Sequence, residues 1–499
     1  MPAAGLEDHV LDPAVYARAI GRFRDAGIML PRFAELAEPH LIPPKVRRAL
    51  AGVKPDDAHA LNLFRVHWYN GRDRTEQVSL PSHVVLPTEL TGIDARIVVA
   101  LGDTFPMIKA HKVLAAYGCL APRVVTGQFD PTAHRAVWPS TGNYCRGGVA
   151  ISRLMQCRGV AVLPEGMSRE RFAWLERWVS APADIIRTPG SESNVKEIYD
   201  KCAELSQDRT NVIFNQFAEF GNHLIHYACT GSALGRIFES MRAAEPTLRM
   251  RAFVSASGSA GTLGAGDYLK DAYGSAIVAA EALECPTMLS NGFGEHNIQG
   301  IGDKHIPLIH NVMNTDFVAA VSDRATDQLG VLFSSAVGRD YLRARRRVAE
   351  ATLADLPAFG LSSICNVLAA IKVAKYCRLG ADDVVMTVAT DGAEMYASER
   401  ERVLARDYAG GYDEAAAAGA FGRWILGTGT DDLLETSLRD RERIFDLGYY
   451  TWVEQQGVAV ADFRARRQQS FWAGLRDKIE AWDALIDEFN ARTKVIESL

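Results

Sequence analysis

Short apolar runs recur along the middle of the chain and are separated by segments with helical periodicity. The runs contain many valine, isoleucine and phenylalanine residues, which is typical of strands buried inside a sheet. Strands that alternate with helices predict an α/β fold with largely parallel strands. The alternation extends from about residue 84 to residue 400, and the candidate strands are 97–101, 160–163, 212–214, 250–254 and 384–388.

The two ends of the chain have a different pattern. Residues 1–78 combine helix-like segments, such as 12–26, with proline breaks such as Pro43-Pro44, and we interpret them as an N-terminal extension. Residues 406–499 are alanine-rich or charged and amphipathic, so we expect a helical C-terminal extension. The remaining core, residues 79–405, together with the length of 499 residues, favours two or more domains or subdomains.

Composition narrows the possible partners. Hydrophobic residues make up 48% of the chain, charged residues 23%, and the formal net charge is −6. No global field favours nucleic acid or an anionic membrane, and no apolar run is long enough to span a bilayer. The first residues lack the basic and apolar regions of a secretory signal, so we expect a cytoplasmic protein. The eight cysteines form no C-x-x-C pair, and we expect reduced, buried thiols without zinc.

Three short segments suggest covalent chemistry on a phosphorylated cofactor. Ala110-His111-Lys112 follows a strand-like run and opens a helix-like segment, and two loops of small residues lie downstream at 139–144 and 257–264. The second loop joins a candidate strand to a helix-like segment, an arrangement in which backbone N–H groups and a helix N-terminus hold phosphate. Because a lysine amine forms a Schiff base with a carbonyl cofactor, Lys112 is the leading candidate for a covalent anchor.

Each segment also has a simpler interpretation when it is considered alone. Lys109 and Lys112 fit two solvated lysines on one helix face, and the Ser, Thr and Asn residues of 140–143 are preferred helix N-caps. Thr390-Asp391-Gly392 follows a strand, where open α/β sheets bind ligands, but Asp-Gly also favours a plain turn. The polar segment 295–302 fits either a loop near a ligand or a surface turn.

His223 and His226 stand at a spacing that places two metal ligands on one helix face. No third ligand follows at a convincing spacing, so we interpret both as polar pocket or core residues. The sequence predicts no metal site.

In chain order, these segments resemble the fold type II, tryptophan synthase β-like family of pyridoxal phosphate enzymes, and within it the cysteine synthase and cystathionine β-synthase branch. Ala110-His111-Lys112 is similar to the lysine motif of tryptophan synthase β chains, and Ser140-Thr141-Gly142-Asn143 is similar to the family's Ser-Gly-Asn loop. The segment 258–262 is similar to the phosphate loop, although Ala260 stands where the family usually has glycine. The resemblance covers roughly residues 80–405 and implies two α/β subdomains.

The resemblance also implies roles for individual residues. Lys112 would form the Schiff base and later move the Cα proton, with Lys109 as its rival. Asn143 would contact the cofactor's O3′. Thr390 would contact the pyridine nitrogen, unless Asp391 reaches it and protonates the ring. The implied cofactor contacts are Lys112, His111, Asn143, Gly258, Ser259, Ala260, Gly261, Thr262 and Thr390, and the implied substrate contacts are Ser140, Thr141 and Gln216.

The function that the resemblance implies is a pyridoxal phosphate-dependent lyase or synthase. It would act on a β-substituted amino acid by β-elimination, with or without addition of a nucleophile. One alternative is a deaminating ammonia-lyase, dehydratase or desulfhydrase, and another is a non-catalytic binding protein that keeps the fold. Relatives of this fold are usually homodimers, so we expect a homodimer.

Overall fold

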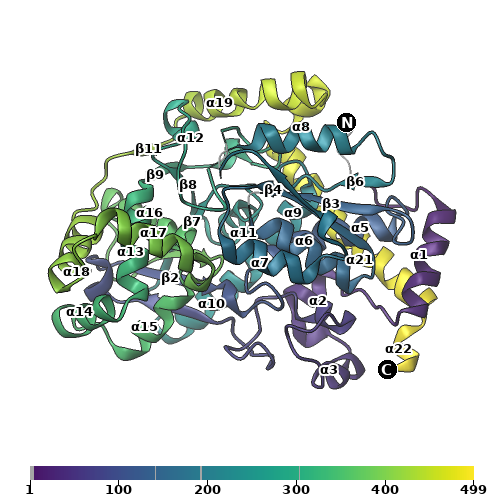
Figure 1. Cartoon of the computed structure of the whole chain (residues 1–499), viewed down its shortest axis with the longest axis horizontal. Coiled ribbons are helices and arrows are strands. Elements are labelled where there is room, and N and C mark those ends of the chain that lie inside the picture. The colour runs from purple at the N-terminus through teal and green to yellow at the C-terminus, as the bar shows by residue number, and fades with distance from the viewer. Residues whose placement is uncertain (1–4, 141, 192–193, 303) are drawn as a thin grey trace.

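The computed structural model describes residues 5–140, 142–191, 194–302 and 304–499. It is an α/β protein with two sheets, each at the centre of one subdomain, and helices from both ends of the chain pack beside them (Figure 1). This confirms the expected fold class.

The smaller sheet is fully parallel and has the strand order β5-β4-β3-β6. Its side chains alternate between two separate cores, as the pleat requires. Val137 and Val160 pack with Ile198 of α8, whereas Trp138 lies in the main core on the side of α6. The elements of this subdomain are β3 (Arg135–Pro139), β4 (Arg158–Pro164), β5 (Ile185–Thr188), β6 (Asn211–Ile213), α5 (Lys112–Val125), α6 (Asn143–Leu154), α7 (Arg169–Trp178), α8 (Val195–Leu205) and α9 (Phe220–Ile225). Helix α10 (Ser232–Ala244) packs against α11 of the other subdomain.

The larger sheet has the order β1-β2-β10-β7-β8-β9-β11, with an antiparallel strand at each edge. The strands between these edges are parallel. The strands and the two helices that pack on them are β1 (His83–Leu86), β2 (Arg96–Leu101), β7 (Arg249–Ala256), β8 (Ala276–Ala282), β9 (Phe317–Val321), β10 (Asp383–Ala389), β11 (Leu433–Glu435), α11 (Leu263–Tyr273) and α16 (Leu361–Tyr376).

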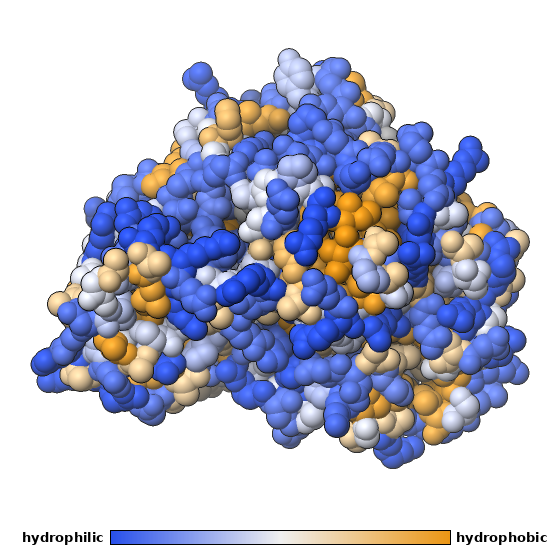
Figure 2. All heavy atoms as spheres, in the orientation of Figure 1, coloured by the Kyte–Doolittle hydropathy of each residue, from blue (hydrophilic) through white to orange (hydrophobic). Residues whose placement is uncertain are grey.

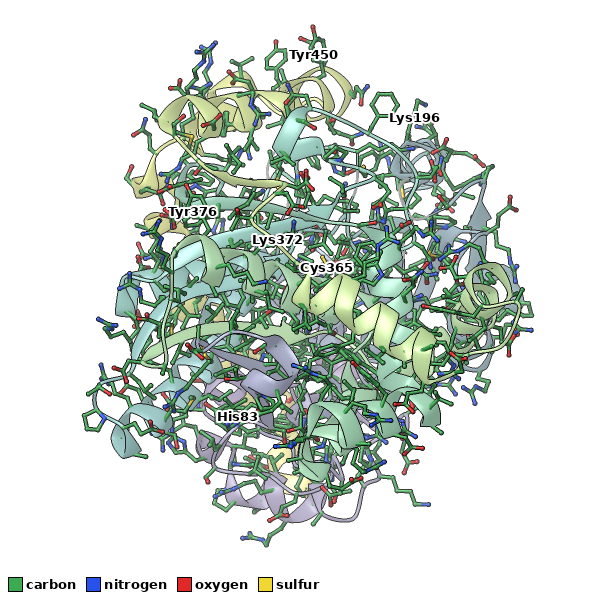
Figure 3. All side chains as sticks on the ribbon, turned by 90° about the vertical axis from the view of Figure 1, so that its left-hand side faces the viewer. His83, Lys196, Cys365, Lys372, Tyr376 and Tyr450 are labelled. Atoms are coloured by element: carbon green, nitrogen blue, oxygen red, sulfur yellow. The ribbon has the colours of Figure 1, made fainter. Side chains whose placement is uncertain are left out.

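Helix α16 is apolar on almost all sides, which is expected of a helix buried between other elements. It packs against β10, β7 and β9 of the sheet and against a neighbouring helix, α13 (Asp323–Ser334). In Figure 3, Cys365, Lys372 and Tyr376 follow one another along this helix. Lys372 is buried, and its Nζ donates to the backbone oxygen of Asp431 at 2.6 Å.

The remaining elements connect or flank the two sheets. The α-helices are α1 (Pro13–Asp25), α2 (Phe33–Ala37), α3 (Pro44–Leu50), α4 (Thr88–Thr91), α12 (Thr287–Ser290), α14 (Ala336–Arg346), α15 (Glu350–Asp355), α17 (Ala397–Asp407), α18 (Glu414–Phe421), α19 (Leu438–Leu447), α20 (Val460–Ala465), α21 (Gln469–Thr493) and α22 (Val495–Ser498). The 3₁₀-helices are η1 (Pro39–Leu41), η2 (Ala60–Arg65), η3 (Gly102–Thr104), η4 (Pro182–Asp184), η6 (Val312–Asn314), η7 (Leu356–Ala358) and η8 (Ala393–Tyr396), and the π-helices are η5 (His226–Gly231), η9 (Gly422–Leu426) and η10 (Tyr450–Gln455).

The two ends of the chain pack against each other. The long helix α21 contacts α1, α2 and α5. The indole of Trp482 in α21 is buried and donates to the backbone oxygen of Glu7 at 2.8 Å. Asp483 accepts from the backbone N–H groups of Phe33 and Ala34, so it caps the N-terminus of α2. The C-terminal segment therefore holds the N-terminal one against the core.

One face of the molecule carries an exposed apolar patch. Figure 2 shows an apolar patch to the right of centre, over the region of β3 and β4 in Figure 1, within a mostly hydrophilic face. No helix in the described part of the chain is long and apolar enough to cross a bilayer.

Four of the candidate strands lie within β2, β4, β7 and β10, and the fifth, 212–214, overlaps β6 but extends one residue beyond its end. The expectation of buried cysteines is wrong for one residue. Seven cysteines are buried, but Cys377 is exposed because it follows the last residue of α16, where that helix leaves the core.

Candidate functional site

A pocket lies between the two subdomains, at the carboxyl ends of strands from both sheets. Ser140 follows β3, Gly258 follows β7 by two residues, and Thr390 follows β10 directly. This is the edge at which parallel α/β sheets bind ligands. The lining residues are Lys112, Ser140, Gly142, Asn143, Tyr144, Gln216, Ser255, Ala256, Gly258, Ala260, Thr262, Gln299, Gly300, Ile301, Ser362, Asn366 and Thr390.

Lys112 is the lysine of this pocket. It is the first residue of α5, and its Nζ donates to the Ser259 hydroxyl at 3.5 Å. The rival Lys109 is more than a third exposed, and its Nζ is 2.8 Å from the Glu394 carboxylate. Lys372 is buried elsewhere, on α16. The geometry therefore favours Lys112 over Lys109 as a group that can react with a ligand in the pocket.

His111 lies behind the glycine loop rather than on the pocket wall. Its Nε2 is 3.2 Å from the Thr262 hydroxyl, and its ring stacks on Trp68 and meets His226 edge to face. Burial, assisted by the charge of Lys112, lowers the pKa of His111 well below its ordinary value. The imidazole is therefore neutral at physiological pH, and it supports the loop through Thr262.

The glycine loop connects β7 to α11 and has almost no spare room. A Cβ added to Gly258 would collide with the backbone oxygen of Gly300, and one added to Gly261 would collide with the Asn222 amide. Asn222 also donates to the Ser259 hydroxyl at 3.0 Å. Ala260 has a φ of 63°, a left-handed conformation that favours glycine. Tight packing on both sides thus fixes the loop whose backbone faces the pocket.

Asn143 is the first residue of α6, and buried partners hold its side-chain amide. Its Nδ2 donates to the Asp391 carboxylate at 2.7 Å, and its Oδ1 accepts from Arg146 at 2.8 Å. Tyr396 also donates to Asp391, at 2.9 Å. Asp391 is thus fully buried behind Asn143, whereas its neighbour Thr390 lines the pocket.

The structure describes two of the three residues that we expect to bind substrate. Ser140 and Gln216 line the pocket, and the Ser140 hydroxyl accepts from the backbone N–H of Gly142 at 2.9 Å. The N-cap of α6 is Gly142, and among the described residues no side chain caps this helix, so the N-cap interpretation of Ser140 and Asn143 is wrong. Thr141 lies outside the described residues.

Gln299 lines the pocket, so the segment 295–302 is a loop at the pocket rather than a surface turn, one of the two interpretations left open above. Sequence reasoning did not identify Ser255, Ser362 and Asn366 as site residues, although all three line the pocket. It also missed the buried charged groups behind the wall, Arg146 and Arg171. His223 and His226 are buried core residues, as expected. Within the described residues, no group of three or more His, Cys, Asp or Glu side chains is arranged to hold a metal ion.

Comparison with known proteins gives distant matches in sequence. The chain is 29% identical over 260 residues to cysteine synthase B of Campylobacter jejuni, a match that covers 50% of this chain and 76% of the relative. It is 26% identical over 199 residues to cystathionine beta-synthase of Saccharomyces cerevisiae, and here the match covers 37% of each protein. No protein-family model matches the chain.

Solved structures share the fold. The cysteine synthase of Entamoeba histolytica superposes with a TM-score of 0.53 at 20% identity, covering 69% of this chain and 92% of the other. The O-acetylserine-dependent cystathionine beta-synthase of Helicobacter pylori gives 0.51 at 21% identity and covers 64% and 94%. The part of the chain beyond these matches is about a third of its length in both comparisons.

Proposed function

The chain is a distant homologue within the cysteine synthase and cystathionine β-synthase group of fold type II pyridoxal phosphate enzymes, and from this premise we propose that it binds pyridoxal phosphate and acts on a β-substituted amino acid. The observation that carries the proposal is the position of Lys112. Its amine lies in one pocket with the glycine loop and with the loop that begins at Ser140.

The residues of the pocket fit the cofactor. Lys112 would hold its aldehyde carbon, and the backbone N–H groups of the loop from Gly258 to Thr262, at the N-terminus of α11, would hold its phosphate. Asn143 faces the same pocket and would contact O3′. When bound, pyridoxal phosphate supplies an electron sink for the carbon from which a proton is removed.

Thr390 would contact the pyridine nitrogen of the cofactor. Its position on the pocket wall supports this choice, because Asp391 is engaged by Asn143 and Tyr396 behind the wall. A neutral hydroxyl leaves the ring less electron-withdrawing than a carboxylate partner would. This favours elimination of a β-substituent over reactions that need a long-lived carbanion.

Lys112 would also move the proton. Its amine lines the pocket 3.5 Å from the Ser259 hydroxyl, and as a basic group it would accept the proton from the substrate Cα. The substrate carboxylate would bind at Ser140 and the neighbouring N-terminus of α6, and Gln216 would contact the substrate from the opposite loop. These residues would contact the part that all β-substituted amino acids share, so they do not determine the leaving group or the nucleophile.

Absorbance tests the cofactor assignment. Purified protein supplied with pyridoxal phosphate should show an absorption band near the edge of the visible range, which is typical of the cofactor bound to a lysine. The Lys112→Ala variant should lose this band, and the Lys109→Ala variant should keep it. Lys372→Ala serves as the control for loss of a buried lysine amine outside the pocket. A wild-type protein without the band, or a Lys112→Ala variant that retains it, contradicts the proposal.

Product analysis separates the reactions. The name of the Helicobacter pylori relative makes O-acetylserine the first substrate to test, with and without an added thiol. A thioether product formed with the thiol supports β-replacement, whereas ammonia and pyruvate alone support the deaminating alternative. Bound cofactor without turnover of any β-substituted amino acid supports a non-catalytic protein.

We further propose that the protein is a cytoplasmic homodimer, as sequence reasoning expected. Light scattering of the purified protein measures the mass, and a monomer would contradict the dimer.

A further inference from the structure

Trp68, in the N-terminal segment, packs behind the residues of the pocket. Its side chain is buried, and its indole ring stacks on the imidazole of His111, with ring centres 5.5 Å apart and an angle of 29° between the planes. Phe105 meets the same indole edge to face at 5.0 Å. Two aromatic contacts thus fix the indole against the residue that precedes Lys112 in the chain.

The indole N–H makes a second connection, to the π-helix η5. It donates to the Thr230 hydroxyl at 2.8 Å, and this hydroxyl lies 2.8 Å from Nδ1 of His226. Burial lowers the pKa of His226 well below its ordinary value, so its ring is neutral. Because an indole N–H can only donate, the Thr230 oxygen accepts from Trp68, and its own proton points to Nδ1 of His226.

The two histidines connect these contacts to the glycine loop. The rings of His111 and His226 meet at 83° with their centres 5.1 Å apart, and Nε2 of His111 lies 3.2 Å from the hydroxyl of Thr262, which lines the pocket. Helix η5 also packs against α11, the helix that follows the loop. Trp68 therefore reaches the support of the loop both through His111 and through η5.

Hydrogen bonds alone do not fix the ring of His111. Its Nδ1 is buried without a hydrogen-bond partner among the described residues, and so is Nε2 of His226. The contact with Thr262 constrains one end of the His111 ring, and the orientation of the ring plane depends on the rings packed against it. Removing the indole would leave the His111 imidazole free to turn away from Thr262.

We propose that Trp68 is a positioning residue for the cofactor phosphate, because it holds His111 against Thr262 and so keeps the Thr262 hydroxyl directed at the pocket. The N-terminal segment is then part of the cofactor site, although none of its described residues lines the pocket. This inference rests on the proposed function, in which the loop from Gly258 to Thr262 binds the phosphate.

The test compares pyridoxal phosphate with pyridoxal, which lacks the phosphate. Each is titrated into the wild type and into Trp68→Leu, the absorption band of the lysine-bound cofactor gives the two Kd values, and their ratio measures the preference for the phosphate. Trp68→Leu should reduce this preference by about tenfold, as for the loss of one hydrogen bond to a charged group. Trp68→Phe, which keeps an aromatic ring against His111, should restore most of it. Thr262→Val, which removes the hydroxyl itself, should reduce it at least as much as Trp68→Leu.

Trp452→Leu is the matched control. Trp452 is also buried, and its indole donates to the backbone oxygen of Ile306 at 2.7 Å, but it does not line the pocket and its ring lies against Tyr199 and His305. A general loss of packing weakens both ligands, whereas a displaced Thr262 hydroxyl weakens the phosphorylated one selectively. Trp452→Leu should leave the preference unchanged.

Failure of the inference and failure of the proposed function give different results. A wild-type protein without the band of lysine-bound cofactor contradicts the proposed function. An unchanged preference in Trp68→Leu, or an equal reduction in Trp68→Leu and Trp452→Leu, contradicts the inference alone. If Trp68→Leu is not recovered as a folded protein, Trp68→Met replaces it in the same comparison.

Discussion

Asp391 shows how one buried side chain connects the pocket wall to the core. It accepts from Asn143 and Tyr396 and lies 3.6 Å from Arg171. Asp391→Asn keeps the shape but removes a buried negative charge beside this guanidinium, so we expect a loss of about 3–5 kcal/mol in the free energy of unfolding. Denaturant titration measures it.

Asp446→Asn is the control for this prediction. Asp446 pairs with Arg467 on the surface, and its side chain is 62% exposed. An exposed pair contributes about 0–1 kcal/mol, so the variant should unfold close to the wild type. If Asp391→Asn behaved like Asp446→Asn, the buried pair of Asp391 and Arg171 would not contribute to stability.

Sequence reasoning identified those site residues that lie in short local motifs. Lys112, Asn143 and Thr390 each follow a strand or begin a helix, so short patterns predicted their place at one end of the sheets. The buried charged side chains behind the pocket wall were not predictable from local patterns. Arg171 and Tyr396 are 225 residues apart, and no local pattern records that their side chains meet.

At the scale of elements, the loop between β7 and α11 makes a prediction about cofactor binding. Gly258→Ala places a methyl group against the backbone oxygen of Gly300, which has no flexible side chain to move aside. The loop must shift, so we expect the Kd for pyridoxal phosphate to rise by at least about tenfold, with about 1–3 kcal/mol of lost stability from overpacking. Equilibrium dialysis of the cofactor measures the first effect.

Gly474→Ala is the matched control. Gly474 lies in α21, and an added Cβ would meet no atom within 4 Å. Alanine stabilises a helix interior by about 0.5–1 kcal/mol relative to glycine, so this variant should bind the cofactor as the wild type does. An equal loss of affinity in both variants would show that the effect is not specific to the loop.

Element prediction succeeded where an apolar strand stands between clear helical patterns and failed elsewhere. The missed β8 reads Ala-Ile-Val-Ala-Ala-Glu-Ala, and alanine does not distinguish a buried strand from a helix. The missed β11 has three residues and lies in the mostly helical C-terminal segment. Only its antiparallel pairing with β9, more than a hundred residues earlier, makes it a strand.

At the scale of the whole molecule, the two ends of the chain depend on each other. Phe33 meets the ring of Trp482 edge to face at 5.8 Å, and the indole also donates to Glu7. We expect Trp482→Ala to cost about 3–5 kcal/mol through the cavity it leaves and to expose residues near Phe33 to protease. Gly474→Ala, on the same helix, is the control and should leave the cleavage pattern unchanged. If Trp482→Ala also left the pattern unchanged, the two ends of the chain would be independent of each other.

Buried titratable groups set the response of the whole molecule to pH. Burial lowers the pKa values of His67, His223, His305 and His310 to about 3, and it lowers those of His111 and His226 well below the ordinary value. The unfolded chain binds these protons below about pH 6.5, so their contribution is lost as pH falls from there to about 3. Burial also raises the pKa values of carboxyl groups, to about 7 for Glu219 and Glu281 and to about 6 for Asp267, Asp327 and Asp483.

The two sets act in opposite directions. The folded state binds the carboxyl protons first, so these groups stabilise it as pH falls towards about 4.5 and offset the histidines over that range. Below about pH 3.8, the ordinary pKa of aspartate, the five carboxyl groups are protonated in both states, and the histidines act alone. We therefore expect only a shallow loss of unfolding free energy between about pH 6 and 4.5, and a steeper loss below about pH 3.8.

Urea denaturation followed by tryptophan fluorescence over a pH series checks the shape of this profile. His305→Gln removes one of these histidines, so the slope below about pH 3.8 should decrease by about 1.4 kcal/mol per pH unit. His40→Gln is the control, because His40 is exposed on the N-terminal segment, and it should leave the slope unchanged. A decline that is as steep between pH 6.5 and 4.5 as it is below pH 3.8 would mean that the buried carboxyl groups do not offset the histidines.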